Sequence, residues 1–134
     1  MPSATPNSNS APEADVFSSQ CASRPVLQHL TGRWGALTVG ALKLAGAPVR
    51  FGEIRRRIDG ISDRMLSQTL TQLERDGMVE RTVHSSIPPH VDYQLTPLGQ
   101  TIAEPLISLI STLESELSTV LDAQQEYDAS IDTD

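Results

Sequence analysis

The sequence predicts a mainly α-helical domain that carries one small β-hairpin. Over most of the chain between residues 26 and 121, apolar residues recur at three- and four-residue spacing, which is the period of an amphipathic helix. Residues 91–95 instead alternate apolar and polar side chains, which is the period of a β-strand. A chain of 134 residues is expected to form one domain.

We expect this domain to span residues 21–121, between two weakly structured ends. Residues 1–20 are rich in Pro, Ser, Ala and Asn and have no apolar period, which is typical of a disordered segment. They also lack the basic start and apolar run of a signal peptide. Residues 122–134 are expected to form an acidic tail. Because no apolar run is long enough to cross a membrane, a cytoplasmic protein is expected.

The first half of the domain is predicted to be helical. A short helix around residues 26–30 ends at Gly32, and a second helix covers residues 34–45. Residues 49–51 are extended, and residues 53–58 form a short helix whose arginines Arg55, Arg56 and Arg57 face outward. The second helix is expected to supply core residues from one face: Trp34, Leu37, Thr38, Ala41, Leu42 and Leu44.

The best-marked helix lies between Ser62, a favourable N-cap, and Gly77, which suits a left-handed residue after the C-terminus. Met65, Leu66, Leu70 and Leu73 define its apolar face. The opposite face carries a set of polar and basic residues with no acid among them: Arg64, Ser67, Gln68, Thr71, Gln72 and Arg75. This distribution is typical of the DNA-reading helix of a helix-turn-helix, although an ordinary solvated helix face is the alternative.

Two strands and a long helix complete the domain. The strands are predicted over residues 78–85 and 91–95, joined by a loop with two prolines. Thr96 and Pro97 suit the N-cap and first position of a helix that runs to about residue 121. Pro105 is expected to kink this helix or restart it near residues 103–104, and residues after Asp122 are expected to fray.

The apolar stripe of the last helix is wider than one small domain needs. A partner helix from a second copy is the expected cover, and folding back onto its own domain is the alternative. The predicted dimer interface consists of Leu27, Leu106, Leu109, Ile110, Leu113 and Leu117.

Charge is distributed unevenly along the chain. Residues 24–100 carry ten basic and seven acidic residues, whereas residues 1–23 carry two acids and residues 101–134 carry eight, neither with a base. A net charge of −7 disfavours general affinity for nucleic acid, but the positive middle is compatible with a local DNA-binding patch.

The order of elements and several short motifs resemble the HxlR family of bacterial transcriptional regulators. The motifs are Cys21, LTGRW at 30–34, RFGEI at 50–54, GIS at 60–62, LERDGMVER at 73–81 and PPHVDYQLTPLG at 88–99, together with Leu66, Ser67 and Leu70. Ala22, Arg33 and His90 depart from the family pattern, which usually has Pro, Lys and Arg there. The resemblance implies a winged helix-turn-helix, in which the hairpin is the wing.

The resemblance further implies a homodimer on palindromic double-stranded operator DNA, expected to act as a repressor. Arg64, Ser67, Gln68 and Thr71 are the expected base-reading residues. Phosphate and wing contacts are expected from Arg55, Arg56, Arg75, Ser85, Ser86 and His90. Any one of these arginines can instead be solvated or locally paired, and Arg57 and Arg81 are expected to be structural.

Cys21 is the sole cysteine of the chain, so an internal disulfide is impossible. It lies thirteen residues before Trp34, where the resemblance places a thiol that senses oxidants or electrophiles in several family members. Reactivity requires a thiolate, and Arg24 or the start of the first helix is the expected source of a lowered pKa. An inert, half-buried thiol is the alternative.

No other chemistry is predicted. Cys21, His29, His84 and His90 have no metal-ligand spacing, and the chain has no phosphate-binding glycine loop and no recognisable acid pair. We therefore expect no metal, no cofactor, no enzymatic activity and no membrane partner. The alternative function, suggested by the net charge, is a winged-helix protein-interaction module that does not bind DNA.

Overall fold

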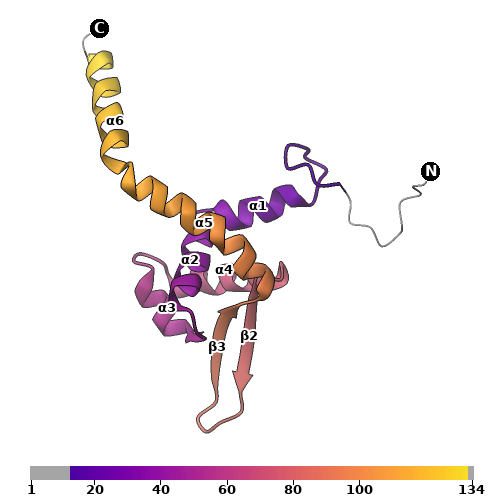
Figure 1. The fold of residues 1–134 in the computed structure, drawn as a ribbon. Helices are drawn as coiled ribbons and strands as arrows, with labels where there is room; N and C mark the ends of the chain where they lie inside the picture. Colours follow the sequence, from indigo (N-terminus) through magenta and orange to yellow (C-terminus); the bar gives the residue numbers. More distant parts are fainter. Residues whose placement is uncertain (1–12, 133–134) are drawn as a thin grey trace, which may run out of the picture.

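The computed structural model describes residues 13–132, in which helices dominate and a small sheet projects from one end (Figure 1). The expected disordered segment therefore lies mostly outside the described residues, and residues 13–22 form turns that lead into the first helix. In chain order the elements are α1 Ser23–Thr31, α2 Gly35–Ala45, β1 Val49–Arg50, α3 Phe51–Arg57, α4 Asp63–Arg75, β2 Val79–His84, β3 His90–Leu95, α5 Pro97–Ser115 and α6 Leu117–Asp132.

The core forms where α2, α4 and α5 meet. Leu66, Leu70 and Leu73 of α4 are buried and pack with Val39 of α2 and Ala103 of α5. Because each fully buried leucine is worth about 1.5–3 kcal/mol, this face fixes the orientation of α4. The opposite face of α4 is consequently held at the surface.

The sheet has three antiparallel strands in the order β1-β3-β2. The predicted hairpin pairs from Val79↔Leu95 at its base to His84↔His90 at its tip. The expectation of a two-stranded hairpin was incomplete, because β1 pairs with β3 through Val49↔Tyr93. Two residues are too short for a strand period, so this strand could be predicted only as an extended piece.

Local capping confirms the predicted ends of the helices. Ser62 Oγ accepts from the Met65 amide at 3.1 Å, and Gly77 has a φ of +79° after the C-terminus of α4. Thr96 Oγ1 accepts from the Gly99 amide at 3.0 Å and donates to the Gly77 carbonyl at 2.6 Å. These side chains satisfy helix-terminal groups that would otherwise lack partners.

The prediction of core burial is wrong for three residues. Leu37 and Leu44 of α2 are 46% and 67% exposed, and Met65 of α4 is 38% exposed. Val39, which was not predicted, is fully buried. The core face of α2 is centred on Thr38, Val39 and Leu42, so leucines at its edges extend past the neighbouring helices.

The C-terminal helices also differ from the prediction. No restart occurs at Pro105, since α5 continues through it to Ser115 and the break falls at Glu116. Pro105 and Thr101 are both exposed, so the Thr101 carbonyl that loses its helical partner can be hydrated. Residues after Asp122 were expected to fray, but α6 continues to Asp132. None of the helices in residues 13–132 is long and apolar enough to span a membrane.

Candidate nucleic-acid interface

The exposed face of α4 presents polar side chains that can donate to base edges and phosphates. Arg64, Ser67, Gln68 and Thr71 are all exposed, while the leucines on the opposite face are buried. The 3.6-residue period places these four residues on neighbouring turns of one helix face. The exposure of these residues agrees with the prediction, and their contact with DNA bases stays a prediction.

The arginines expected to contact phosphate differ in their local pairing. Arg55 Nε lies 3.1 Å from Asp63 Oδ1, and both side chains are largely exposed, so the pair is weak and can open. Arg75 Nη1 lies 3.9 Å from Asp76 Oδ1. Arg56 is exposed and forms no ion pair among residues 13–132. Arg57 and Arg81, expected to be structural, are exposed as well.

The tip of the wing carries exposed serines beside the fully exposed Ile87. Ser85 and Ser86 are exposed, and Ser86 Oγ lies 3.2 Å from His90 Nδ1 while it donates to the Pro88 carbonyl at 3.3 Å. His84 was not predicted as a wing residue, yet its ring stacks on that of His90 with 4.4 Å between centroids. The β2–β3 register places the two histidines opposite each other, and sequence spacing alone did not reveal it.

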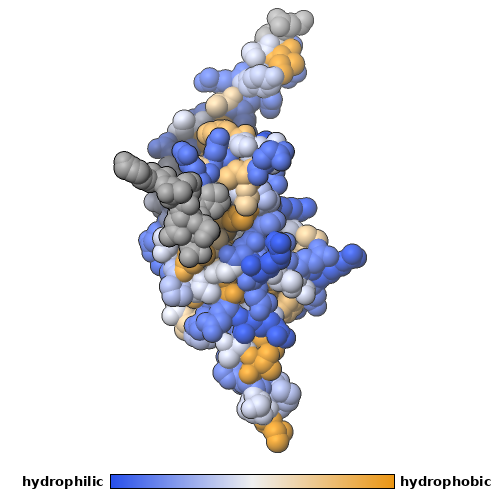
Figure 2. All heavy atoms as spheres, turned by 90° about the vertical axis from the view of Figure 1, so that its right-hand side faces the viewer, coloured by the Kyte–Doolittle hydropathy of each residue, from blue (hydrophilic) through white to orange (hydrophobic). Residues whose placement is uncertain are grey.

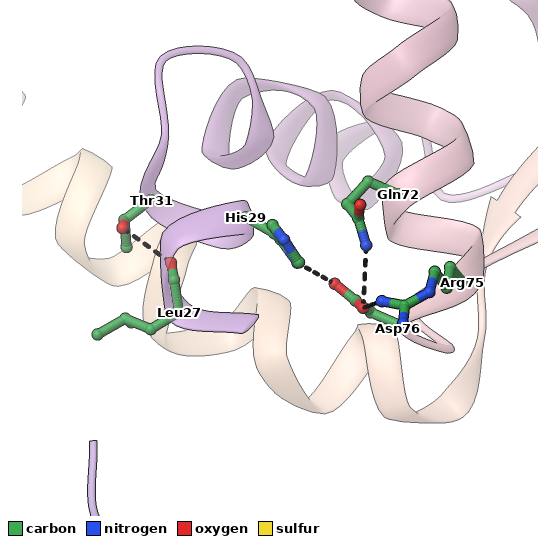
Figure 3. Close-up of polar contacts among 6 residues, drawn as sticks. All are labelled: Leu27, His29, Thr31, Gln72, Arg75 and Asp76. Carbon is green, nitrogen blue, oxygen red and sulfur yellow. Dashed lines mark hydrogen bonds and ion pairs between the residues drawn. The ribbon is translucent and has the colours of Figure 1, made fainter. Parts of the chain in front are cut away.

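A polar network joins α1 to the C-terminal end of α4 (Figure 3). His29 Nδ1 lies 2.7 Å from Asp76 Oδ2, and the Asp76 side chain is only 5% exposed. Gln72 Nε2 donates to the other carboxylate oxygen at 3.3 Å. This contact links α1 directly to the C-terminal end of α4.

The Cys21 thiol lies just before α1 and is surrounded by hydrogen-bond donors. Its sulfur is 3.0 Å from Ser23 Oγ and accepts from the Asp15 amide at 3.3 Å. The hydrogen bond from the Ser23 side chain, assisted by the Asp15 and Ser23 amides, lowers the pKa of Cys21. Of the two expected causes, Arg24 instead donates to the Phe17 carbonyl, whereas the start of α1 contributes through its first residue, Ser23.

An uncovered apolar stripe follows α5 and α6, and Figure 2 shows apolar side chains at the surface in this upper part of the molecule. Among the predicted interface residues, Leu27, Leu109, Leu113 and Leu117 are 44–60% exposed. Ile110 is half-buried. The prediction is wrong for Leu106, which is 8% exposed and belongs to the core of the single chain.

The acidic residues are concentrated away from the wing. Helix α6 carries Asp122, Glu126, Asp128 and Asp132 without a basic residue. It projects from one end of the molecule, and the wing projects from the other (Figure 1). Salt screens charges beyond about 8–10 Å, so these carboxylates do not cancel the arginines around α4.

Comparison with known proteins shows which family has this sequence and fold. The family model for the HxlR-like helix-turn-helix matches residues 29–120. The chain belongs to the HxlR family. It is accordingly a winged helix-turn-helix transcriptional regulator, as the resemblance in its motifs predicted.

Individual HxlR relatives cover most of the chain. The HTH-type transcriptional regulator YtfH of Escherichia coli K12 is 43% identical over 114 residues, which are 85% of this chain and 89% of that protein. The YtfH structure from Salmonella typhimurium, described as that of a transcriptional regulator, has 43% identity and a TM-score of 0.77, covering 85% of this chain and 99% of its own. The structure of the redox regulator HypR in its reduced form has 30% identity and a TM-score of 0.67. The match covers 75% of this chain and 97% of the HypR chain.

Proposed function

We propose that this HxlR protein is a homodimeric repressor that binds a palindromic operator with helix α4 in the major groove. The observation that supports this most directly is the polar face of α4 around Arg64 and Gln68, held at the surface by the buried Leu66, Leu70 and Leu73. Arg64, Ser67, Gln68 and Thr71 read base edges from this face. Arg55, Arg56, Arg75 and the wing residues Ser85, Ser86 and His90 contact the backbone.

The dimer is proposed to form through the uncovered stripe of α5 and α6, with Leu27 of α1 at its edge. Leu109, Leu113 and Leu117 lie on this stripe and are about half exposed in the single chain. Pairing of two such stripes removes apolar surface from water and places the two α4 helices on one side of the assembly. Reading successive major grooves requires the helices to be about 34–36 Å apart.

Oxidants or electrophiles are the proposed input, acting through Cys21. Two features support this role: the lowered pKa of the thiol, caused first by the Ser23 hydrogen bond, and the likeness to HypR, which is named a redox regulator. Two Cys21 thiols, one from each subunit, give up two electrons and two protons to diamide, which is reduced to its hydrazine, and form one disulfide. The His29–Asp76 contact carries the resulting movement of α1 to α4.

The test measures the affinity for DNA upstream of the gene that encodes the protein, by fluorescence anisotropy. Reduced protein is expected to bind this DNA more tightly than a scrambled duplex of equal length. Diamide should release it, and dithiothreitol should restore binding. Cys21→Ser should bind like the reduced protein and ignore diamide. Equal affinity for both duplexes would contradict the operator proposal, and a full diamide response in Cys21→Ser would exclude the thiol.

A further inference from the structure

The outer face of the wing brings together three side chains that can bind metal ions. His84 Nε2 lies 2.8 Å from Asp92 Oδ2, and His90 Nε2 lies 3.9 Å from the same oxygen. The ligand atoms of the three residues all lie within 4.8 Å of one another. The arrangement follows from the register, because His84 is opposite His90 and Asp92 is two residues further along β3 on the same face.

The two ring nitrogens of His90 have different surroundings. Ser86 Oγ lies 3.2 Å from His90 Nδ1 and 3.3 Å from the Pro88 carbonyl oxygen, so it occupies the Nδ1 side of the His90 ring. Nε2 is therefore the His90 nitrogen that faces Asp92. It lies 3.9 Å from Asp92 Oδ2, beyond hydrogen-bond distance, which leaves room for a cation between the two atoms.

From this geometry we infer that His84, His90 and Asp92 bind a divalent transition-metal ion of the zinc class. Tetrahedral zinc with bonds of about 2.0–2.1 Å requires its ligand atoms to be about 3.3 Å apart. The two His–Asp separations, 2.8 and 3.9 Å, lie on either side of this value, and the two histidine ligand atoms are within 4.8 Å of each other, so side-chain movements of about 0.5–1.5 Å close the site. Two imidazoles and a carboxylate suit Zn²⁺ better than Mg²⁺ or Ca²⁺, which prefer oxygen ligands.

The residues around the three ligands are compatible with a bound metal ion. Ser86 holds the His90 ring through its second nitrogen, as the outer residues of zinc sites commonly do. His84 must move its hydrogen from Nε2 to Nδ1 to become a ligand, and its 41% exposed side chain can do so through water. Three protein ligands leave the fourth zinc position for water or for another oxygen donor.

The consequence of this site for DNA binding rests on the proposed function. The ligand set carries one negative charge with neutral imidazoles, and a bound divalent ion makes the cluster positive. Arg50, the β1 residue paired with Asp92, is the nearest cation in the sheet register. A loaded wing would therefore attract phosphate more strongly than a metal-free wing.

The test uses the full-length Cys21→Ser protein without DNA, so that neither the thiol nor operator binding affects the result. Calorimetric titration with ZnCl2 should show one saturable ion per chain. His84→Gln, His90→Gln and Asp92→Asn should each weaken binding by at least about tenfold, and Ser86→Ala by about tenfold. The matched control is His29→Gln. His29 lies on α1 and pairs with Asp76, so its replacement should leave the zinc titration unchanged.

A second measurement requires no substitution in the wing. Imidazole NMR signals of Cys21→Ser should shift for two of its three histidines as Zn²⁺ is added, while His29 stays unchanged. Absence of a saturable site, or unchanged affinity in both His84→Gln and His90→Gln, would overturn the inference. So would shifts confined to His29. Because no DNA is present, these measurements test zinc binding independently of whether the protein binds an operator.

Discussion

At the residue scale, the hydrogen bonds around the Cys21 sulfur make a prediction about its reactivity. Because they lower the pKa of the thiol, the thiolate accumulates at lower pH than in an ordinary cysteine. The rate of alkylation by iodoacetamide should therefore rise with pH and reach half its plateau below the pH that a free thiol needs. Ser23→Ala removes the side-chain hydrogen bond that lowers the pKa most, so it should move this midpoint to higher pH.

The control for this experiment is Ser19→Ala, which alters a nearby exposed serine with no contact to the sulfur. Its midpoint should match that of the unmodified protein. An unchanged midpoint in Ser23→Ala, or an equal shift in both variants, would show that Ser23 does not control the thiol.

Single-residue roles were predictable where they depend on local sequence and not where they depend on tertiary pairing. The exposure of Arg64 and Gln68 follows from helix period alone. The partner of His29 is Asp76, 47 residues away, and no spacing rule connects them. Arg24 was assigned to the thiol by proximity in sequence, whereas its guanidinium lies at the Phe17 carbonyl.

At the element scale, the N-cap of α4 should stabilise the helix that carries the base-reading residues. Ser62 Oγ accepts from the Met65 amide, and its loss leaves that amide without its partner. Ser62→Ala is expected to lower the free energy of unfolding by about 1 kcal/mol, measured by urea denaturation. Ser67→Ala, an exposed serine within the same helix, should change it by less than about 0.5 kcal/mol. Equal losses in both variants would contradict the capping role.

Elements with strong local signals were predicted well, and those that depend on packing were not. Caps and glycine positions marked both ends of α4. Strand β1 is defined by pairing with β3, which the sequence does not show. Pro105 was expected to kink α5 or restart it. No restart occurs, because the exposed position of Pro105 lets water satisfy the unpaired carbonyl. The His84–His90–Asp92 cluster was missed for the same reason as β1, since only the register brings its members together.

At the scale of the whole molecule, the uncovered stripe predicts an obligatory partner. Replacing Leu109 and Leu113 by Asp should give a monomer or an insoluble chain, because each buried leucine contributes about 1.5–3 kcal/mol. Light scattering at micromolar concentration measures the outcome. Ile87→Asp is the matched control, since Ile87 is 99% exposed in the loop between β2 and β3, away from the stripe. A stable monomer of the unmodified protein would refute the dimer.

Specific DNA recognition by α4 is the central claim, and Gln68 tests it most directly. The measurement compares Gln68→Ala with the unmodified protein on an operator selected from random duplexes and on unselected DNA. Operator affinity should fall by about 1–3 kcal/mol while affinity for unselected DNA stays the same. Gln125→Ala, an exposed glutamine of α6, should change neither. Unchanged operator affinity in Gln68→Ala, or equal losses on both DNAs, would contradict base reading by this residue.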